Sequence, residues 1–239
     1  MKLSVVIPVL NERATIGDII QRVRAVPAVH EIVVVDDGST DGTTEVLAGL
    51  GDSITVLRHE RNRGKGAAIR TGLEAVTGDM VIIQDADLEY DPQDYMPIMA
   101  TMLEKQARVV YGSRILSHSR MSYLRFWLGG RFITWCCNLL YGSSLTDEPT
   151  CYKMIEADLL RQLDLKGNGF EFCPEVTGKI LRCGIPIYEV PIRYAPRTIE
   201  EGKKIRWRDG LTALWYLVKI RFSRPPCVSR SYGTAEPGR

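Results

Sequence analysis

The sequence lacks an apolar run that could cross a membrane as a helix, which takes roughly 20 residues. It also lacks an excess of one charge, since 31 Lys and Arg stand against 29 Asp and Glu and leave a formal net charge of +2. Domains that hold a nucleic-acid backbone are usually much more basic. We therefore expect no nucleic-acid partner. The sequence also shows no internal repeat and no N-terminal signal peptide.

The six cysteines have none of the paired spacings that are typical of metal sites, and only Cys136 and Cys137 are adjacent. Without a signal peptide, they are expected to be reduced thiols in the cytoplasm. A chain of 239 residues, 45% of them hydrophobic, can bury one substantial core. These features together predict an intracellular, globular enzyme.

The chain does contain short apolar runs that end in polar residues. Runs this apolar are typical of strands buried on both faces, as in a parallel sheet. Apolar residues at helical spacing, from Ile16 to Val26, follow the first run. Alternating strands and helices predict a doubly wound α/β layer, in which ligands bind at the carboxyl ends of the strands. The predicted strands are Leu3–Val9, Ile32–Val35, Met80–Gln84 and Val109–Tyr111.

Two carboxylates, Asp85 and Asp87, directly follow the third run. Alternate strand residues point to opposite faces, so both carboxylates can reach one ion only if the chain turns there. The segment Leu88–Pro92 predicts such a turn. Clustered carboxylates repel unless a cation neutralises them, and a hard divalent ion that also binds phosphate is the usual solution. The pattern therefore indicates a Mg²⁺ or Mn²⁺ site, although an acidic loop in water remains the alternative.

Five motifs in a fixed order give the chain a family resemblance. They are Val5–Glu12, Val35–Ser39, Asn62–Ala68, Asp85–Asp87 and Gly112–Arg114. This series resembles family 2 glycosyltransferases, and most closely the branch of dolichol-phosphate mannosyltransferase and related polyprenyl-phosphate glycosyltransferases. The resemblance implies a single GT-A type, Rossmann-like catalytic domain over residues 1–222, with a mainly parallel sheet flanked by helices.

The same resemblance implies roles for individual residues. Asp87, Arg114, Arg131 and Asp147 would be catalytic, Arg131 and Arg197 would bind the acceptor, and Asp85, Asp87 and Glu89 would hold the metal. The family often has glutamine where Glu89 stands, so Glu89 is either a third metal ligand or a solvated carboxylate. The nucleotide sugar would contact Pro8, Asn11, Glu12, Asp37, Lys65, Asp85, Ala86, Asp87, Arg114, Arg197 and Lys204.

Some of these residues have a structural alternative. Glycines beside Lys65 could let the backbone approach a diphosphate at a helix N-terminus, or could simply let a loop pack closely. Asp147 and Glu175 could bind sugar hydroxyls or be structural. Asp147 is also the one candidate base for a reaction that would need one.

Two segments combine apolar, aromatic and basic residues, Leu124–Tyr141 and Leu211–Phe222. They predict amphipathic interfacial helices within residues 113–145 and 207–222, or helices packed on the catalytic domain. Residues 193–224 hold nine Lys and Arg against three Asp and Glu, which would attract anionic lipid. The tail, residues 223–239, is predicted to be disordered.

These expectations combine into an inverting transferase that moves a hexose from GDP-mannose or a UDP-hexose to a polyprenyl or dolichyl phosphate. Because a lipid phosphate is already anionic near neutral pH, it needs little help from a base. We expect peripheral association with the cytosolic membrane face, with a membrane-anchoring partner subunit as a further expectation. The alternatives are a family 2 enzyme acting on a sugar or protein hydroxyl, and a sugar nucleotidyltransferase. The glycine- and arginine-containing N-terminal loop typical of the latter is missing.

Overall fold

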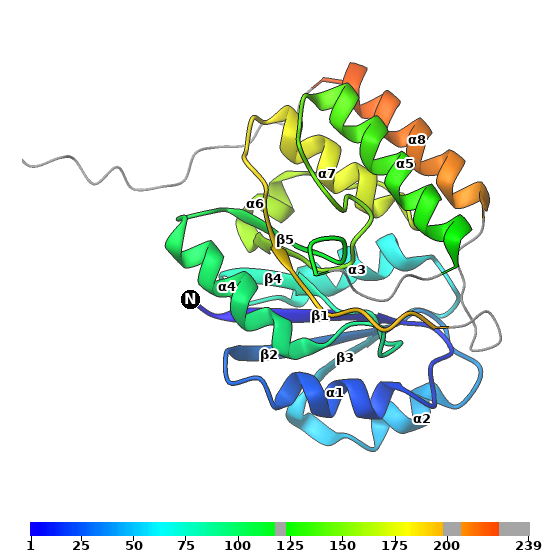
Figure 1. Cartoon of the computed structure of the whole chain (residues 1–239). Helices are drawn as coiled ribbons and strands as arrows, with labels where there is room; N and C mark the ends of the chain where they lie inside the picture. The colour runs from blue at the N-terminus through cyan, green and yellow to red at the C-terminus, as the bar shows by residue number, and fades with distance from the viewer. Residues whose placement is uncertain (118–122, 198–206, 225–239) are drawn as a thin grey trace, which may run out of the picture.

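The computed structural model describes residues 1–117, 123–197 and 207–224 (Figure 1). Lys204 and the predicted tail beyond residue 224 lie outside the described residues. One sheet of seven strands forms the centre, with the order β3-β2-β1-β4-β6-β5-β7. The strands are β1 (Leu3–Val9), β2 (Val29–Asp36), β3 (Thr55–Arg58), β4 (Met80–Ile83), β5 (Val109–Ser113), β6 (Lys153–Glu156) and β7 (Tyr188–Pro191).

All neighbouring strands are parallel except β6, which runs antiparallel to both β4 and β5. The predicted α/β class with a mainly parallel sheet is thus confirmed. The chain goes from β1 to β2 on one side and reaches β4 on the other side of β1. The strand order therefore reverses beside β1, and such a switch point opens a crevice at the carboxyl ends of the strands.

Helices cover both faces of the sheet (Figure 1). The sequence folds into them where apolar residues recur every three or four positions, as in the amphipathic helix α1, which buries Ile16, Ile19, Ile20 and Val23. The helices are α1 (Ile16–Arg24), α2 (Thr43–Ala48), α3 (Lys65–Ala75), α4 (Tyr95–Glu104), α5 (Leu124–Tyr141), α6 (Ala157–Gln162), α7 (Phe172–Arg182) and α8 (Trp207–Phe222). Two short 3-10 turns, Gly51–Ser53 and Pro92–Asp94, complete the set.

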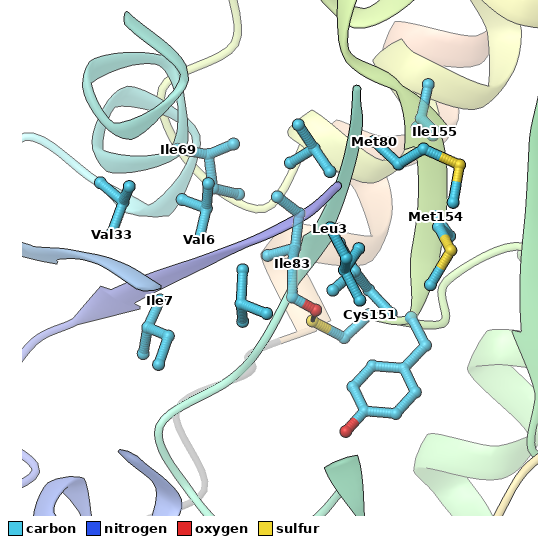
Figure 2. Packing of buried hydrophobic residues seen from close by; sticks show 14 of the residues in the cluster. Leu3, Val6, Ile7, Val33, Ile69, Met80, Ile83, Cys151, Met154 and Ile155 are labelled. Atoms are coloured by element: carbon cyan, nitrogen blue, oxygen red, sulfur yellow. Dashed lines mark hydrogen bonds between the residues drawn. The ribbon is translucent and has the colours of Figure 1, made fainter. Parts of the chain in front are cut away.

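The main core lies between β1, its neighbouring strands and α3 (Figure 2). Val6 of β1 pairs with Val33 on one side and with Ile83 on the other, and all three are buried. Helix α3 comes close to these strands because Gly72 has no side chain. A Cβ there would lie only 2.7 Å from Val6 Cγ1. This close packing holds α3 against β1 and β2.

Helices α5, α7 and α8 form a second packed unit above the sheet (Figure 1). Cys137 of α5 and Leu217 of α8 are fully buried in a small cluster of their own. The hydroxyl of Tyr141 donates to the carbonyl oxygen of Leu217 at 2.7 Å, which joins α5 to α8. One side of each predicted interfacial helix therefore packs on the catalytic domain.

Candidate active site

A cavity of about 870 Å³ lies at the carboxyl ends of β1 and β4. Its volume is in the range usual for small-molecule sites. Residues 194–197, here called the strap, lie along its edge. Asn11, Glu12, Asp87 and Arg197, from the predicted nucleotide-sugar set, line it together with Arg13, Ala14, Thr15, Asp41, Leu88, Ala195 and Pro196.

The exit of β1 is tied to the exit of β2. Asn11 has a left-handed backbone, with φ of 52°, which asparagine tolerates better than most residues. Its backbone N–H donates to Ser39 Oγ at 2.9 Å, and its Oδ1 accepts from the N–H of Thr40 at 2.8 Å. Pro8 precedes Asn11 in the chain, lies inside β1 and pairs with Val35 of β2. The structure thus brings the first two motifs into one rim of the cavity.

Asp37 is buried, and both of its carboxylate oxygens hold neighbouring segments. Oδ1 accepts the N–H of Arg63 at 2.8 Å and lies 2.6 Å from His59 Nδ1, while Oδ2 accepts the N–H of Gly64 at 2.7 Å. On the far side of the imidazole, Nε2 lies 2.9 Å from Thr71 Oγ1. Asp37 therefore positions the turn before α3, and its contact with a nucleoside stays a prediction. No motif in the sequence pointed to His59.

The glycines that flank Lys65 serve close loop packing. A Cβ on Gly64 or on Gly66 would lie 2.4 Å from a carbonyl oxygen of the loop 166–169. The N–H of Ala67 also donates to that loop, to the carbonyl oxygen of Asn168 at 3.0 Å. In the structure, these two glycines thus let the loop 166–169 pack closely against the start of α3. Lys65 itself extends elsewhere, to the carboxylate of Asp85.

Glu175 stabilises the same loop 166–169. Its side-chain oxygens accept the N–H groups of Lys166 and Gly167, and Oε1 lies 2.7 Å from Lys179 Nζ. The side chain is buried and fully used by these partners. Of its two predicted roles, the structural one therefore describes the observed contacts.

The two aspartates after β4 lie on a tight turn. Leu88 has φ of 63°, an unusual value for a residue with a bulky side chain, and the chain reverses there as predicted. Asp85 Oδ1 lies 2.5 Å from Lys65 Nζ. Burial alone would raise the pKa of Asp85, but the charge of Lys65 outweighs it, and the pKa lies below its usual value. Asp87 Oδ2 lies 3.2 Å from Arg197 Nη2. The buried residue Ala86 separates Asp85 from Asp87 in the sequence.

Glu89 is turned toward the strap. Its Oε2 accepts the hydroxyl of Tyr194 at 2.7 Å, and its Oε1 accepts the backbone N–H of Arg197 at 2.7 Å. The backbone carbonyl of Glu89 accepts the N–H of Ala195 as well, at 2.9 Å. In the described residues, no group of three carboxylate, imidazole or thiol side chains is arranged to hold a metal ion. The predicted trio of Asp85, Asp87 and Glu89 is therefore not assembled as a ligand set.

The site nevertheless fits a divalent ion through two carboxylates. Mg²⁺ usually keeps several waters and is held by one or two carboxylates together with substrate phosphates, so it does not need a complete protein cage. Asp85 and Asp87 offer that pair directly after β4; Asp87 lines the cavity, and each of the two carboxylates contacts a basic side chain. They would hold the ion, and phosphate oxygens of the donor would complete its coordination.

Arg114 follows the end of β5, pairs with Asp147 and lies over the ring of Tyr194 in the strap. The guanidinium donates to both carboxylate oxygens, and the backbone N–H of Arg114 adds a third bond at 2.9 Å. Burial alone would raise the pKa of Asp147, but Arg114 outweighs it, and the pKa lies below its usual value. Arg131 donates to the carbonyl oxygen of Thr146 at 3.0 Å. The structure thus pairs Arg114 with Asp147 and places Arg131 on the neighbouring Thr146, and their catalytic roles stay a prediction.

A buried polar network behind Asp85 escaped the sequence prediction. Gln84 Nε2 donates to the carbonyl oxygen of Asp85 at 2.8 Å. Its Oε1 accepts the hydroxyls of Tyr95 and Tyr152, at 2.5 and 2.6 Å. The available signal was a lone polar residue at the end of a buried apolar run. This network fixes the backbone from which Asp85 projects.

The family model for glycosyl transferase family 2 matches residues 4–160, which is more than half of the chain. The chain belongs to glycosyl transferase family 2. The undecaprenyl-phosphate mannosyltransferase of Micrococcus luteus is 29% identical over 92% of this chain and 99% of its own length. The dodecaprenyl-phosphate galacturonate synthase of Rhizobium johnstonii is 28% identical over 73% of this chain. The dolichol-phosphate mannosyltransferase of Pyrococcus furiosus is 26% identical over 92% of this chain.

Some of these relatives are much longer than the matched region. The alignment spans 53% of the Rhizobium protein, 63% of the Pyrococcus protein and 48% of a hexosyltransferase of low-salt glycan biosynthesis from Haloferax volcanii. Among solved structures, glucosyl-3-phosphoglycerate synthase from Mycobacterium tuberculosis superposes with a TM-score of 0.73 at 22% identity, covering 92% of this chain and 79% of that one. This likeness shows the shared GT-A fold. The same neighbour has been crystallised with UDP and either Mn²⁺ or Mg²⁺.

Helices α5 and α8 each expose a stripe of large apolar side chains on the side that faces away from the core. Within the described ranges, no helix combines the length and the apolar character that crossing a membrane would need. The stripes recur at helical spacing, which places each on one side of its helix. We call them together the apolar face: Leu124, Leu128, Phe132, Trp135 and Leu139 of α5, and Leu211, Trp215, Val218 and Phe222 of α8.

Proposed function

We propose that the protein transfers a hexose from a nucleotide sugar, GDP-mannose or a UDP-hexose, to the phosphate of a polyprenyl or dolichyl phosphate. The observation that carries this proposal is the pairing of Asp147 with Arg114. Asp147 is the candidate base that the sequence offers, and both of its carboxylate oxygens accept from the guanidinium of Arg114. A hydroxyl acceptor would need that base, whereas a phosphate acceptor is already ionised and would need cations instead.

The relatives support the same acceptor class. The names of the three polyprenyl-phosphate transferases described above, from Micrococcus, Rhizobium and Pyrococcus, each include a polyprenyl or dolichol phosphate. Their match extends to 92% of this chain for two of them. The enzyme class therefore follows from the family, and the lipid phosphate is the acceptor that the residues on this side of the site suit best.

The donor would lie in the cavity between β1 and the strap. Its nucleoside would approach the rim of Asn11 and Glu12, and its diphosphate would reach Asp85, Asp87 and Lys65. When bound, a divalent ion neutralises charge on the departing nucleoside diphosphate. Arg197 lies at the same edge and supplies a planar fork that suits phosphate oxygens. These groups hold the leaving group on one side of the sugar.

The acceptor phosphate would approach from the side of Arg114 and Arg131. Asp147 keeps the guanidinium of Arg114 in one orientation, and Arg131 remains exposed beside it. A phosphate oxygen would attack the anomeric carbon while the bond from that carbon to the diphosphate breaks. Because this is a single displacement, the anomeric centre inverts.

The apolar face would bring the site to its lipid substrate. Exposed Arg125, Arg131, Lys219 and Arg221 lie on the same two helices. Apolar and aromatic side chains beside basic ones are typical of helices that lie in a membrane interface. The cytosolic leaflet carries the anionic lipids that such cations attract. We infer peripheral binding to that leaflet, and a membrane-anchoring subunit remains a further prediction.

A donor screen tests this function. The purified full chain is incubated with undecaprenyl or dolichyl phosphate, Mg²⁺ or Mn²⁺, and one radiolabelled nucleotide sugar at a time. The proposal predicts that label from at least one hexose donor becomes extractable into organic solvent in a time-dependent way. It fails if no donor labels the lipid while sugar or peptide hydroxyl acceptors become labelled.

A further inference from the structure

Arg197 lies where the carboxylates at the cavity's edge converge. Its Nη2 lies 2.9 Å from Glu12 Oε1 and 3.2 Å from Asp87 Oδ2, and its Nη1 lies 3.1 Å from Glu12 Oε2. The guanidinium is well shielded, with only 17% of the side chain exposed. One tethered positive charge therefore neutralises two acids from different strand ends, β1 and β4.

The side chain of Glu89 contacts both ends of the strap that carries Arg197. Glu89 accepts from Tyr194 with one oxygen and from the backbone of Arg197 with the other, at 2.7 Å each. Tyr194 in turn packs against Tyr90 and under the guanidinium of Arg114, with a ring-to-guanidinium distance of 5.1 Å. Glu89 thus holds both ends of the strap, and each of its carboxylate oxygens accepts a hydrogen bond there.

We propose that Glu89 is a positioning residue that seats Arg197 on Asp87, and that Arg197 there competes with the divalent cation. This inference rests on the metal site of the proposed function. A guanidinium on a carboxylate makes charge-assisted hydrogen bonds, which are stronger than neutral ones. A cation that binds Asp87 must displace them.

The competition couples metal binding to donor binding. When a cation binds Asp87 in the absence of a donor, it displaces Arg197, and the guanidinium finds no new anion to bind. The cation therefore binds weakly. With a nucleoside diphosphate present, the displaced guanidinium has phosphate oxygens to bind, and its loss is offset. Such coupling is reciprocal: the cation strengthens diphosphate binding by the same factor. A free metal ion alone is then a poor ligand, and metal and donor bind best together.

Mn²⁺ binding to the full chain, followed by the electron paramagnetic resonance signal of free Mn²⁺, tests the competition. Without nucleotide, Arg197→Ala should bind Mn²⁺ about tenfold more tightly, because the ion no longer has to displace the guanidinium from Asp87. With saturating GDP or UDP this difference should shrink, because the displaced guanidinium of the wild type then has phosphate oxygens to bind. Arg193→Ala is the matched control. It removes the same charge, but from Asp91 and Asp94, and should leave Mn²⁺ affinity unchanged.

The role of Glu89 is tested in the Arg197→Ala background, where its effect on Arg197 is already absent. If Glu89 only positions Arg197, adding Glu89→Ala should change Mn²⁺ affinity less than about threefold, as expected when the two changes act through one element. If Glu89 is a metal ligand, the double variant should lose Mn²⁺ binding, and that result would overturn the proposal. Circular dichroism confirms that each variant is folded.

The outcomes separate this inference from the function on which it rests. Mn²⁺ binding by the wild type with unchanged affinity in Arg197→Ala would overturn the competition alone. No Mn²⁺ binding by any form, even with GDP or UDP, would overturn the metal site and the inference with it.

Discussion

The guanidinium of Arg114 donates a hydrogen bond to each carboxylate oxygen of Asp147, from Nε to Oδ2 at 2.8 Å and from Nη2 to Oδ1 at 2.7 Å. The two residues are 33 positions apart in the chain, and Glu189 holds the backbone of Asp147 through an N–H bond of 3.0 Å. A two-point ion pair of this kind fixes orientation as well as charge. Asp147 therefore acts as the support of Arg114.

The first prediction concerns this support. Asp147→Asn keeps the shape of the side chain but loses the charge and one acceptor oxygen. Losing a charge-assisted bond costs about 1.5–3 kcal/mol, so kcat/KM for lipid transfer should fall roughly tenfold or more. Asp158→Asn, at an exposed ion pair with Arg161, is the control and should leave transfer unchanged. Wild-type kcat/KM in Asp147→Asn would show that Arg114 needs no such support.

The second prediction concerns Asp85 and Asp87. Changing either one to asparagine should remove most divalent-ion-dependent transfer while the fold persists, because the proposed metal site relies on both carboxylates to hold the ion against the diphosphate. Transfer is measured across a Mg²⁺ titration, with circular dichroism as the folding check. Full transfer by both variants, or by the wild type in excess chelator, would refute the metal assignment.

The third prediction concerns pH and the buried Glu148, next to Asp147. Burial raises the pKa of Glu148, and the opposing charge of Lys153 does not cancel the effect. The folded state therefore holds this proton more tightly than the unfolded state. Its contribution to stability is fully present below the unfolded pKa, about 4.3, and is lost as pH rises through the raised folded pKa.

Glu148→Gln should accordingly stabilise the protein at pH 7, with a higher midpoint of thermal unfolding. The gain should disappear below about pH 4, where the wild-type carboxyl is protonated in both states. Lys153 keeps its partners in the variant, because its ammonium donates to backbone carbonyl oxygens of Glu148 and Thr150. A variant that is less stable at neutral pH would show that the charged carboxylate is needed in the core.

The fourth prediction concerns the apolar face. Trp135 and Trp215 are 58% and 62% exposed, one on each helix. Changing both to glutamate should release the protein from anionic liposomes in a sedimentation assay. Moving a carboxylate into the apolar part of the interface costs free energy, and the anionic lipids repel it. Leu103→Glu, an exposed apolar position on α4, is the control and should still sediment. A wild-type protein that stays in the supernatant at low salt would contradict the interfacial role.

Much of the fold could be predicted from local sequence. Strands β1, β4 and β5 are mostly apolar runs; β1 coincides with its predicted bounds, β4 lies within them, and β5 extends beyond them to Ser113. Strand β6 could not be found in this way, because it begins with Lys153, a charged residue that is buried only through its bonds to two carbonyl oxygens. Helices α5 and α8 were recognised by composition, but the division of each into a packed and an exposed side needed the tertiary structure.

Of the predicted nucleotide-sugar residues, Asn11, Glu12, Asp87 and Arg197 line the cavity, but their contacts could not be predicted. The carboxylate pair and the arginines follow from motifs that lie at strand ends. The partners of Glu89 are 105 and 108 residues away in sequence, at Tyr194 and Arg197, so no local pattern indicates them. The same is true of Asp37, whose oxygens hold the turn at residues 63 and 64. Long-range contacts thus decide what a motif residue does.

The most direct test of the proposed function compares polyprenyl phosphate with the neutral polyprenol, in wild type and in Arg131→Ala. The proposed function predicts transfer to the phosphate alone. It also predicts about a tenfold or greater loss in Arg131→Ala, the effect of one charge-assisted contact, with little change in binding of the free nucleoside diphosphate. Efficient transfer to the polyprenol, or an Arg131 variant that loses donor binding instead, would contradict it.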